Sequence, residues 1–244
     1  MTFLFILAGT SVLVGLAAPS IRRTPVLWYG VALALDFVYA YGMIVGLPPG
    51  VLQLLTPLVQ RGMLATSLFV VVMYCGVFPE HSAPRRLIAP IRTELSLMAC
   101  LLAAAHCLNY LSSYVGVLLM RANVLSGNQL ASLIIALALA ALLVVLGVTS
   151  IRAVKRRMRA ASWKNLQRLA YGFFGLIYVH EVLILYPAAF KGSGDAAATL
   201  AVSTVVFGAY GVLRIARYLK DRHGRPVHSA EAEFEEEVGY GCAG

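Results

Sequence analysis

Two histidines stand inside long apolar runs of the sequence, and they are the residues best suited to chemistry. His106 lies near the middle of the run Leu95–Leu119, and His180 lies within the run Leu166–Tyr186. An ionisable side chain inside a bilayer is costly and usually has a function there. Two imidazoles on separate helices predict the two axial ligands of one haem iron. A hydrogen bond to a neighbouring helix is the competing interpretation of each histidine taken alone.

The composition is that of a membrane protein. The chain has 244 residues, of which 60% are hydrophobic and 13% are charged. A soluble domain carries about 25% charged residues. The apolar residues form runs close to the roughly 20 residues that cross a hydrocarbon core as a helix. We therefore predict an all-α fold, a polytopic bundle of transmembrane helices.

Seven apolar runs are predicted to be transmembrane helices. Their approximate bounds are Phe3–Ala18, Val26–Gly46, Gly62–Phe78, Leu95–Leu119, Gln129–Val148, Leu166–Tyr186 and Ala196–Leu213. The first run is followed by Arg22 and Arg23, which reverses the charge order of a cleavable signal peptide, so we expect a retained helix. The segment Leu47–Gln60, which contains Pro48 and Pro49, is expected to lie along the membrane interface as a half-helix.

The basic residues predict the orientation. With the N-terminus outside, all but three of the 20 Lys and Arg residues fall in inner loops or in the C-terminal tail; the exceptions are Arg61, Arg121 and Lys191. This distribution follows the positive-inside rule. The net charge of +9 is therefore a topology signal, and we expect no nucleic-acid partner. The prediction is a multi-pass protein of the cytoplasmic membrane of the cell, with its C-terminus in the cytoplasm.

The densest positive charge lies in the segment Arg152–Lys164, and two interpretations of it stay open. It is either a topology signal in contact with anionic membrane lipid, or a docking surface for an acidic flavoprotein or the phosphates of a flavin. The tail from Asp221 onward is polar and ends in an acidic cluster. It is either a solvated end or a docking handle for a cytosolic partner.

Other motifs limit the chemistry. The sequence has no GxGxxG motif after a strand, no Walker loop and no CxxCH attachment site, so any haem is non-covalent and b-type. The cysteines have no metal-binding spacing, and those in apolar runs are expected to be packing residues: Cys75, Cys100 and Cys107. The remaining histidines lie in loops or the tail and are expected to be solvated: His81, His223 and His228.

Two acidic residues have predicted surroundings. Asp36 lies in the middle of the second run, where a carboxylate should face the bundle. It serves there either in proton or quinone handling or in a structural hydrogen bond. Glu94 lies at the inner membrane edge and is expected to pair with a loop arginine.

Around His180 the sequence resembles a known family. The matching residues are Thr149, Ser150, Trp163, Lys164, Leu166, Arg168, Leu169, Tyr171 and His180. Their pattern is similar to the ferric reductase-like transmembrane domain, found in the haem subunit of the bacterial periplasmic methionine sulfoxide reductase system and in the membrane half of NADPH oxidases. The helix with His106 occupies the place of the family's other ligand helix. The resemblance covers about Val26 to Leu219.

The resemblance implies a division of the chain into three parts. Residues 26–219 form the six-helix haem-binding domain, residues 1–25 an added N-terminal helix and loop, and residues 220–244 a polar, acidic cytoplasmic tail. Many members carry a second, inner pair of haem ligands. This chain has Gln167 in place of one inner histidine, and the region before His106 offers only Arg92 and Thr93. The resemblance therefore implies one haem b, ligated by His106 and His180.

The function that the resemblance implies is electron transfer. The chain is expected to be a membrane b-type cytochrome, an electron-transfer subunit of an oxidoreductase, that passes electrons to an extracytoplasmic acceptor or partner reductase. The electron source stays open among a flavin (FMN or FAD), a quinone and a cytosolic flavoprotein. The alternative is a non-redox integral membrane protein, either a transporter or an assembly or scaffold subunit. The sequence shows no internal repeat of the kind that many transporters have.

Overall fold

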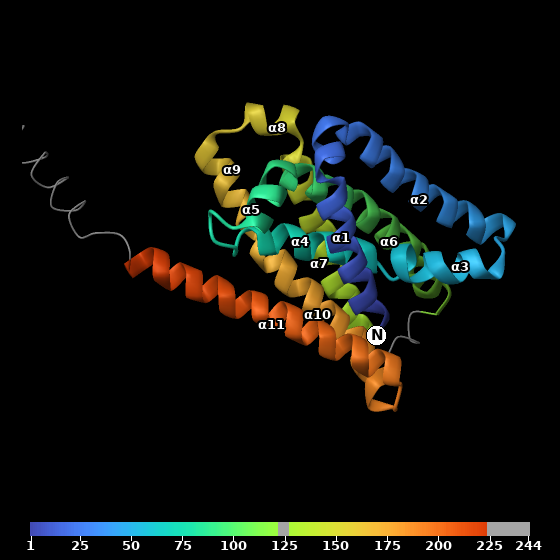
Figure 1. Ribbon diagram of the computed structural model, residues 1–244. Helices are drawn as coiled ribbons and strands as arrows, with labels where there is room; N and C mark the ends of the chain where they lie inside the picture. The colour runs from blue at the N-terminus through green and yellow to red at the C-terminus, as the bar shows by residue number, and fades with distance from the viewer. Residues whose placement is uncertain (122–126, 224–244) are drawn as a thin grey trace, which may run out of the picture.

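The computed structural model describes residues 1–121 and 127–223, which are helical and contain no strand (Figure 1). The predicted all-α bundle is confirmed. In chain order the elements are α1 Thr2–Arg23, α2 Pro25–Val45, α3 Pro49–Leu55, the π-helical turn η1 Thr56–Gln60, α4 Met63–Cys75, α5 Ala83–Ile88, the 3-10 turn η2 Ala89–Ile91, α6 Arg92–Arg121, α7 Gly127–Ser150, α8 Arg152–Arg157, α9 Ala160–Gln167, α10 Leu169–Phe190 and α11 Gly194–His223. The acidic cluster of the tail, His228 and Cys242 lie outside the described residues.

Six helical segments of the described chain are long and apolar enough to cross a membrane. They contain α1, α2, α6, α7, α10 and α11, and they match six of the seven predicted runs in order. The remaining run, Gly62–Phe78, forms α4, which has only 13 residues. At a rise of about 1.5 Å per residue, α4 is roughly 20 Å long, too short for a hydrocarbon core of about 30 Å. It counts as a seventh crossing only together with Pro49–Gln60, to which it is joined at a bend of 43°.

The short helix α4 forms the centre of the bundle. Between Ala65 and Cys75 every residue is buried except Thr66 and Tyr74. A helix that is apolar on all sides is buried on all sides. α1 and α6 pack against α4. The same core continues to the aromatic rings of Phe174 on α10 and Phe207 on α11, which stack with centroids 4.4 Å apart.

The N-terminal helix belongs to this core. Phe3 and Ile21, near its two ends, are each 1% exposed, and Val14 and Ile21 are members of the central hydrophobic cluster. α1 contacts α4 and α11 as well as its sequence neighbour α2. One hydrophobic core is thus shared by residues 1–25 and residues 26–219, which the sequence assigned to separate parts.

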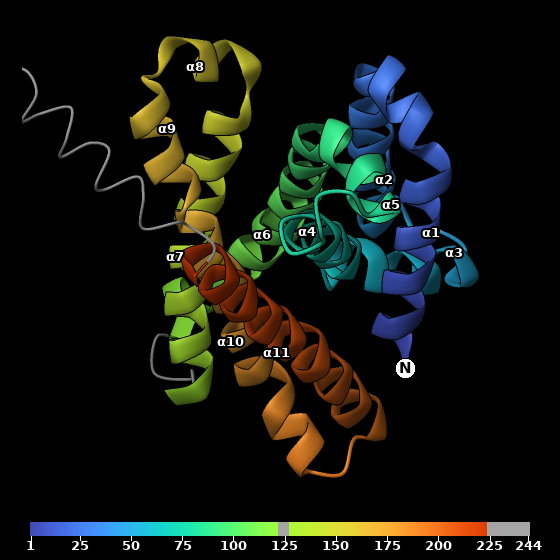
Figure 2. The same cartoon turned by 60° about the vertical axis from the view of Figure 1, so that its left-hand side comes forward.

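Ion pairs join three segments at one end of the bundle. The amino group of Met1 lies 3.3 Å from Oδ1 of Asp195, near the start of α11. Nη1 of Arg61, at the bend before α4, lies 3.9 Å from Oδ2 of the same carboxylate. In Figure 2 the N-terminus and the turn between α10 and α11 lie toward the bottom, while α8 and α9 lie at the top. All three segments are ones that the sequence predicts to be outside.

At the opposite end, α6 is paired with the segment that follows α7. Nη2 of Arg152 lies 2.5 Å from Oε1 of Glu94, so the predicted pairing of Glu94 with a loop arginine is confirmed. Glu94 is buried, whereas Arg152 is exposed. The hydrogen bond and the negative charge of Glu94 raise the pKa of Arg152, which keeps this guanidinium charged.

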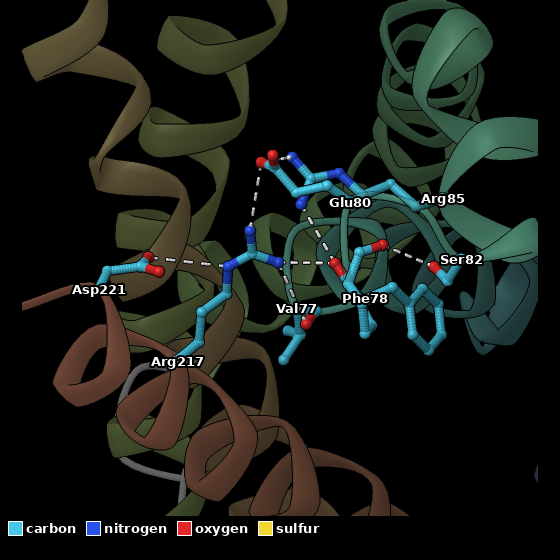
Figure 3. A network of polar contacts seen from close by, with 8 residues as sticks. Val77, Phe78, Glu80, Ser82, Arg85, Arg217 and Asp221 are labelled. Atoms are coloured by element: carbon cyan, nitrogen blue, oxygen red, sulfur yellow. Dashed lines mark hydrogen bonds and ion pairs between the residues drawn. The ribbon is translucent and has the colours of Figure 1, made fainter. Parts of the chain in front are cut away.

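A second contact at this end fastens α11 to the turn after α4 (Figure 3). The guanidinium of Arg217 donates hydrogen bonds to the backbone carbonyls of Val77 at 3.3 Å and of Phe78 at 2.6 Å. The carboxylate of Glu80 lies 3.6 Å from Arg217 and 3.2 Å from Arg85. Arg217 therefore binds carbonyls of the turn and a carboxylate together, which fixes the end of α4 relative to α11.

Candidate functional site

His106 on α6 is held by the break that precedes α4. Its Nδ1 lies 2.5 Å from the backbone carbonyl oxygen of Gln60. Gln60 is the last residue of η1, and the last carbonyls of a helix have no donor within it. A carbonyl oxygen only accepts hydrogen bonds, so Nδ1 carries the proton and Nε2 presents its lone pair. Metal-ligating histidines are commonly held in this tautomer by such a bond.

Gly62 permits this close approach. Its φ is +66°, in the left-handed region, and it is the residue immediately before the first residue of α4. A Cβ atom at this position would lie 3.1 Å from Nδ1 and 3.3 Å from Cγ of His106. Glycine is therefore required both by the backbone conformation and by the imidazole ring packed against it.

His180 on α10 is held by α7. Its Nδ1 lies 3.3 Å from Oγ of Ser132, a residue that is 3% exposed. A hydroxyl both donates and accepts; when Ser132 accepts from Nδ1, Nε2 of His180 presents its lone pair. Near the start of α7, the amide of Asn128 also donates to the backbone carbonyl of Leu183. Two side chains of α7 thus fix the half of α10 that contains His180.

α7 packs against both α6 and α10, the two helices that carry the histidines. The histidines lie roughly 21 Å along α6 and 16 Å along α10, counted from Arg92 and Leu169, which begin the two helices. The ring of Tyr110 packs beside His106, with centroids 5.0 Å apart. The structure therefore brings into one region of the bundle the two residues that the sequence singled out.

The donor set fits a haem better than a protein-only metal site. Residues 1–121 and 127–223 contain no group of three or more His, Cys, Asp or Glu side chains able to hold a metal ion. A b-type haem needs only two protein ligands, because the porphyrin supplies the others. His106 and His180, each with Nδ1 against an oxygen atom, are the two residues that could hold such a group.

Gln167 on α9 is bonded to Thr149 at the end of α7. The amide nitrogen of Gln167 lies 3.2 Å from the Thr149 hydroxyl. The indole nitrogen of Trp163 donates to the backbone carbonyl of Thr149 at 3.1 Å. Thr149, Trp163 and Gln167 thus form one hydrogen-bonded cluster that joins the end of α7 to α9.

Two acidic side chains within the spans have an incomplete set of partners. Oε1 of Glu181, the residue after His180, accepts a hydrogen bond from Oγ of Ser203 at 2.7 Å. In the described part of the chain, Oε2 of Glu181 and Oδ1 of Asp36 are buried without a hydrogen-bond partner. Of the two alternatives for Asp36, a structural hydrogen bond is not formed by Oδ1. Buried polar atoms of this kind are often found at functional sites.

The fold and these contacts define a multi-pass, all-α membrane protein with two histidines held inside the bundle. The chain is similar to an uncharacterized protein of Treponema pallidum (strain Nichols), with 35% identity over 175 residues, or 72% of this chain and 48% of that protein. The chain therefore spans about half the length of this curated relative. No protein-family model matches the chain, and no solved structure is similar to it. The resemblance to the ferric reductase-like family stays a prediction.

Proposed function

We propose that the chain is a membrane b-type cytochrome of the ferric reductase-like kind, with one non-covalent haem b between His106 and His180. The observation that supports this proposal is that both imidazoles are held through Nδ1. Nδ1 of each lies against an oxygen of a different element, the Gln60 carbonyl or the Ser132 hydroxyl. Nε2 of each is then the ligand atom. A haem bound by two histidines supplies a one-electron carrier whose axial positions are filled, so it transfers electrons rather than binding oxygen.

The proposed orientation in the membrane follows from the charge distribution, and the proposed direction of electron transfer follows from the resemblance to the ferric reductase-like family. The N-terminus lies outside the cytoplasmic membrane, and the basic ends of the helices lie inside. Electrons enter from a cytosolic flavin (FMN or FAD), a flavoprotein or the quinone pool, and leave to an extracytoplasmic acceptor or partner reductase. The charged contact among Met1, Arg61 and Asp195 marks the outer end in this arrangement.

The chain's own residues have separate tasks in this proposal. The Gln60 carbonyl fixes the tautomer of His106, and Ser132 orients the ring of His180. Tyr110 packs beside the imidazole of His106 and limits its rotation. Because these contacts come from elements other than the histidines' own helices, the geometry of the ligands depends on the packing of the bundle.

The absorption spectrum of the purified protein tests the ligand assignment. The wild-type chain should give a low-spin spectrum that is insensitive to carbon monoxide. His106→Ala and His180→Ala should each lose the haem or give a high-spin form that reacts with carbon monoxide. His81→Ala, in an exposed loop, is the matched control and should keep the wild-type spectrum. A wild-type low-spin spectrum in both histidine variants would show that the ligand assignment is wrong. No haem absorbance in the wild type would favour the non-redox alternative.

The number of haems tests the absence of the inner pair. Because Gln167 replaces an inner histidine, quantitative haem extraction should give a single haem per chain, with a single redox midpoint. Two haems with two resolved midpoints would show that another side chain takes the place of the inner ligand.

A further inference from the structure

A cavity of about 310 Å³ lies at the end of the bundle that carries the basic segment. Side chains of α4, α6, α7, α9 and α10 line it, together with Lys155 of α8. Its volume is at the lower end of the roughly 300–1,000 Å³ of small-molecule sites. The candidate haem ligands His106 and His180 are not among its lining residues. The cavity is therefore distinct from the site proposed for electron transfer.

The charged side chains that line this cavity are all cations, namely Arg92, Lys155, Lys164 and Arg168. Within residues 1–121 and 127–223, none of these four forms an ion pair with a carboxylate. Nζ of Lys155 instead lies 4.1 Å from the centre of the Trp163 ring. The sequence from Ser150 to His180 contains no acidic residue. Four cations around one cavity without a local counter-charge favour an anionic ligand.

Most of the remaining lining is apolar or aromatic; the uncharged polar residues are Thr93, Ser96, Ser150 and Gln167. Phe69 and Phe173 meet edge to face with centroids 5.1 Å apart, and Phe174 and Leu143 extend this apolar wall. These residues lie in the hydrophobic core of the bundle. A ligand that satisfies both parts of the cavity has a charged end at the cations and an apolar end at the phenylalanines.

We infer that the cavity binds the phosphate headgroup of an anionic membrane phospholipid. Three of its walls, α6, α7 and α10, belong to membrane-spanning segments. At the start of α10, Leu169 and Tyr171 are 42% and 45% exposed, which leaves apolar surface for lipid beside the cations. Basic clusters at the ends of transmembrane helices attract anionic headgroups. Because the cations surround a cavity, one lipid binds at a defined site, rather than many lipids binding over the whole basic surface.

Binding of defined lipids to the purified full chain, measured by native mass spectrometry from an uncharged detergent, tests this inference. Phosphatidylglycerol should bind more tightly than phosphatidylcholine. The double variant Lys164→Gln/Arg168→Gln should weaken phosphatidylglycerol binding by about tenfold or more, because two cations near the headgroup are removed. The control Arg156→Gln/Arg157→Gln removes the same charge from exposed residues that do not line the cavity, and should leave the affinity nearly unchanged.

Three outcomes would overturn the lipid assignment. Equal loss in the two double variants would mean that the basic surface attracts lipid without a specific site. Equal affinity for phosphatidylglycerol and phosphatidylcholine would show that the negative charge of the headgroup does not contribute to binding. Tighter binding of FMN or inorganic phosphate, lost in Lys164→Gln/Arg168→Gln, would assign the cavity to a soluble phosphate ligand. Cys100→Phe, which fills the apolar part of the cavity and keeps its cations, should also weaken lipid binding.

Discussion

Among single residues, Gly62 has two independent reasons to be glycine: its left-handed φ and the imidazole of His106 beside it. Gly62→Ala should destabilise the protein by about 1–2 kcal/mol from the backbone alone, with a further loss from displacing His106. Thermal unfolding in detergent measures the first effect, and the haem spectrum measures the second. Gly175→Ala is the control, because a Cβ there meets nothing within 4 Å on a helix where alanine is favoured. Wild-type stability and spectrum in Gly62→Ala would contradict the tight packing on His106.

Ser132 should matter to the proposed haem site through His180. Ser132→Ala removes the group that orients the ring, and haem affinity should fall by about 10-fold or more, as for other residues that hold a metal ligand. Titration of haem into the apoprotein measures this affinity. Ser203→Ala is the matched control, since that buried serine is bonded to Glu181 instead. Equal haem affinity in the Ser132 variant and the wild type would leave His180 without a positioning residue.

The sequence predicted the histidines but not the groups that hold them. His106 and His180 stand out because imidazoles are rare in apolar runs. Gln60 and Ser132 lie 46 and 48 residues from their partner histidines, and their contacts depend on how helices pack. The Gln60 contact is also made by a backbone oxygen, which every residue has, so residue type gives no signal. Gly62 follows the charged residue Arg61 and begins an apolar run, which indicates a helix boundary but does not identify the histidine that packs beside it.

At the scale of elements, hydropathy identified the helices correctly and misjudged the length of α4. The run Gly62–Phe78 is apolar enough for a crossing, but the helix ends at Cys75. The apolar residues of α4 are buried by the surrounding helices. Many apolar residues of α2 and α10 are instead exposed on the outside of the bundle. A hydropathy pattern does not distinguish burial in protein from burial in lipid, so composition alone could not give this result.

Arg217 is the residue that fastens two elements most directly. Arg217→Gln removes charged hydrogen bonds to the carbonyls after α4 and should cost about 1.5–3 kcal/mol, because the carbonyl oxygens lose their donor. The unfolding midpoint in detergent is the measurement. Arg222→Gln, at an exposed position near the end of α11, is the control and should change stability little. If the two variants lose the same stability, the contact in Figure 3 does not hold α11 to α4.

At the scale of the whole molecule, the ion pairs of Asp195 bring together Met1 and Arg61, which the predicted topology places on the same side of the membrane as Asp195. Reporter fusions at Gly50, Arg121 and Gly194 should report an extracytoplasmic location, and those at Ala83 and Ala160 a cytoplasmic one, because basic loops stay inside. Alkaline phosphatase and green fluorescent protein fusions provide opposite signals at each site. A cytoplasmic signal from the fusion at Arg121 would contradict the orientation.

The short central helix also has a consequence for how the chain is made. Synthesis delivers α4 to the membrane before α6, yet α6 is one of the helices that cover it. A segment of roughly 20 Å cannot anchor itself across the bilayer by its own length. Stable insertion of α4 therefore has to await a later part of the nascent chain. In released chains truncated before Arg92, Cys75 of α4 should react with a water-soluble thiol reagent, whereas in the full chain, where Cys75 is buried, it should be protected.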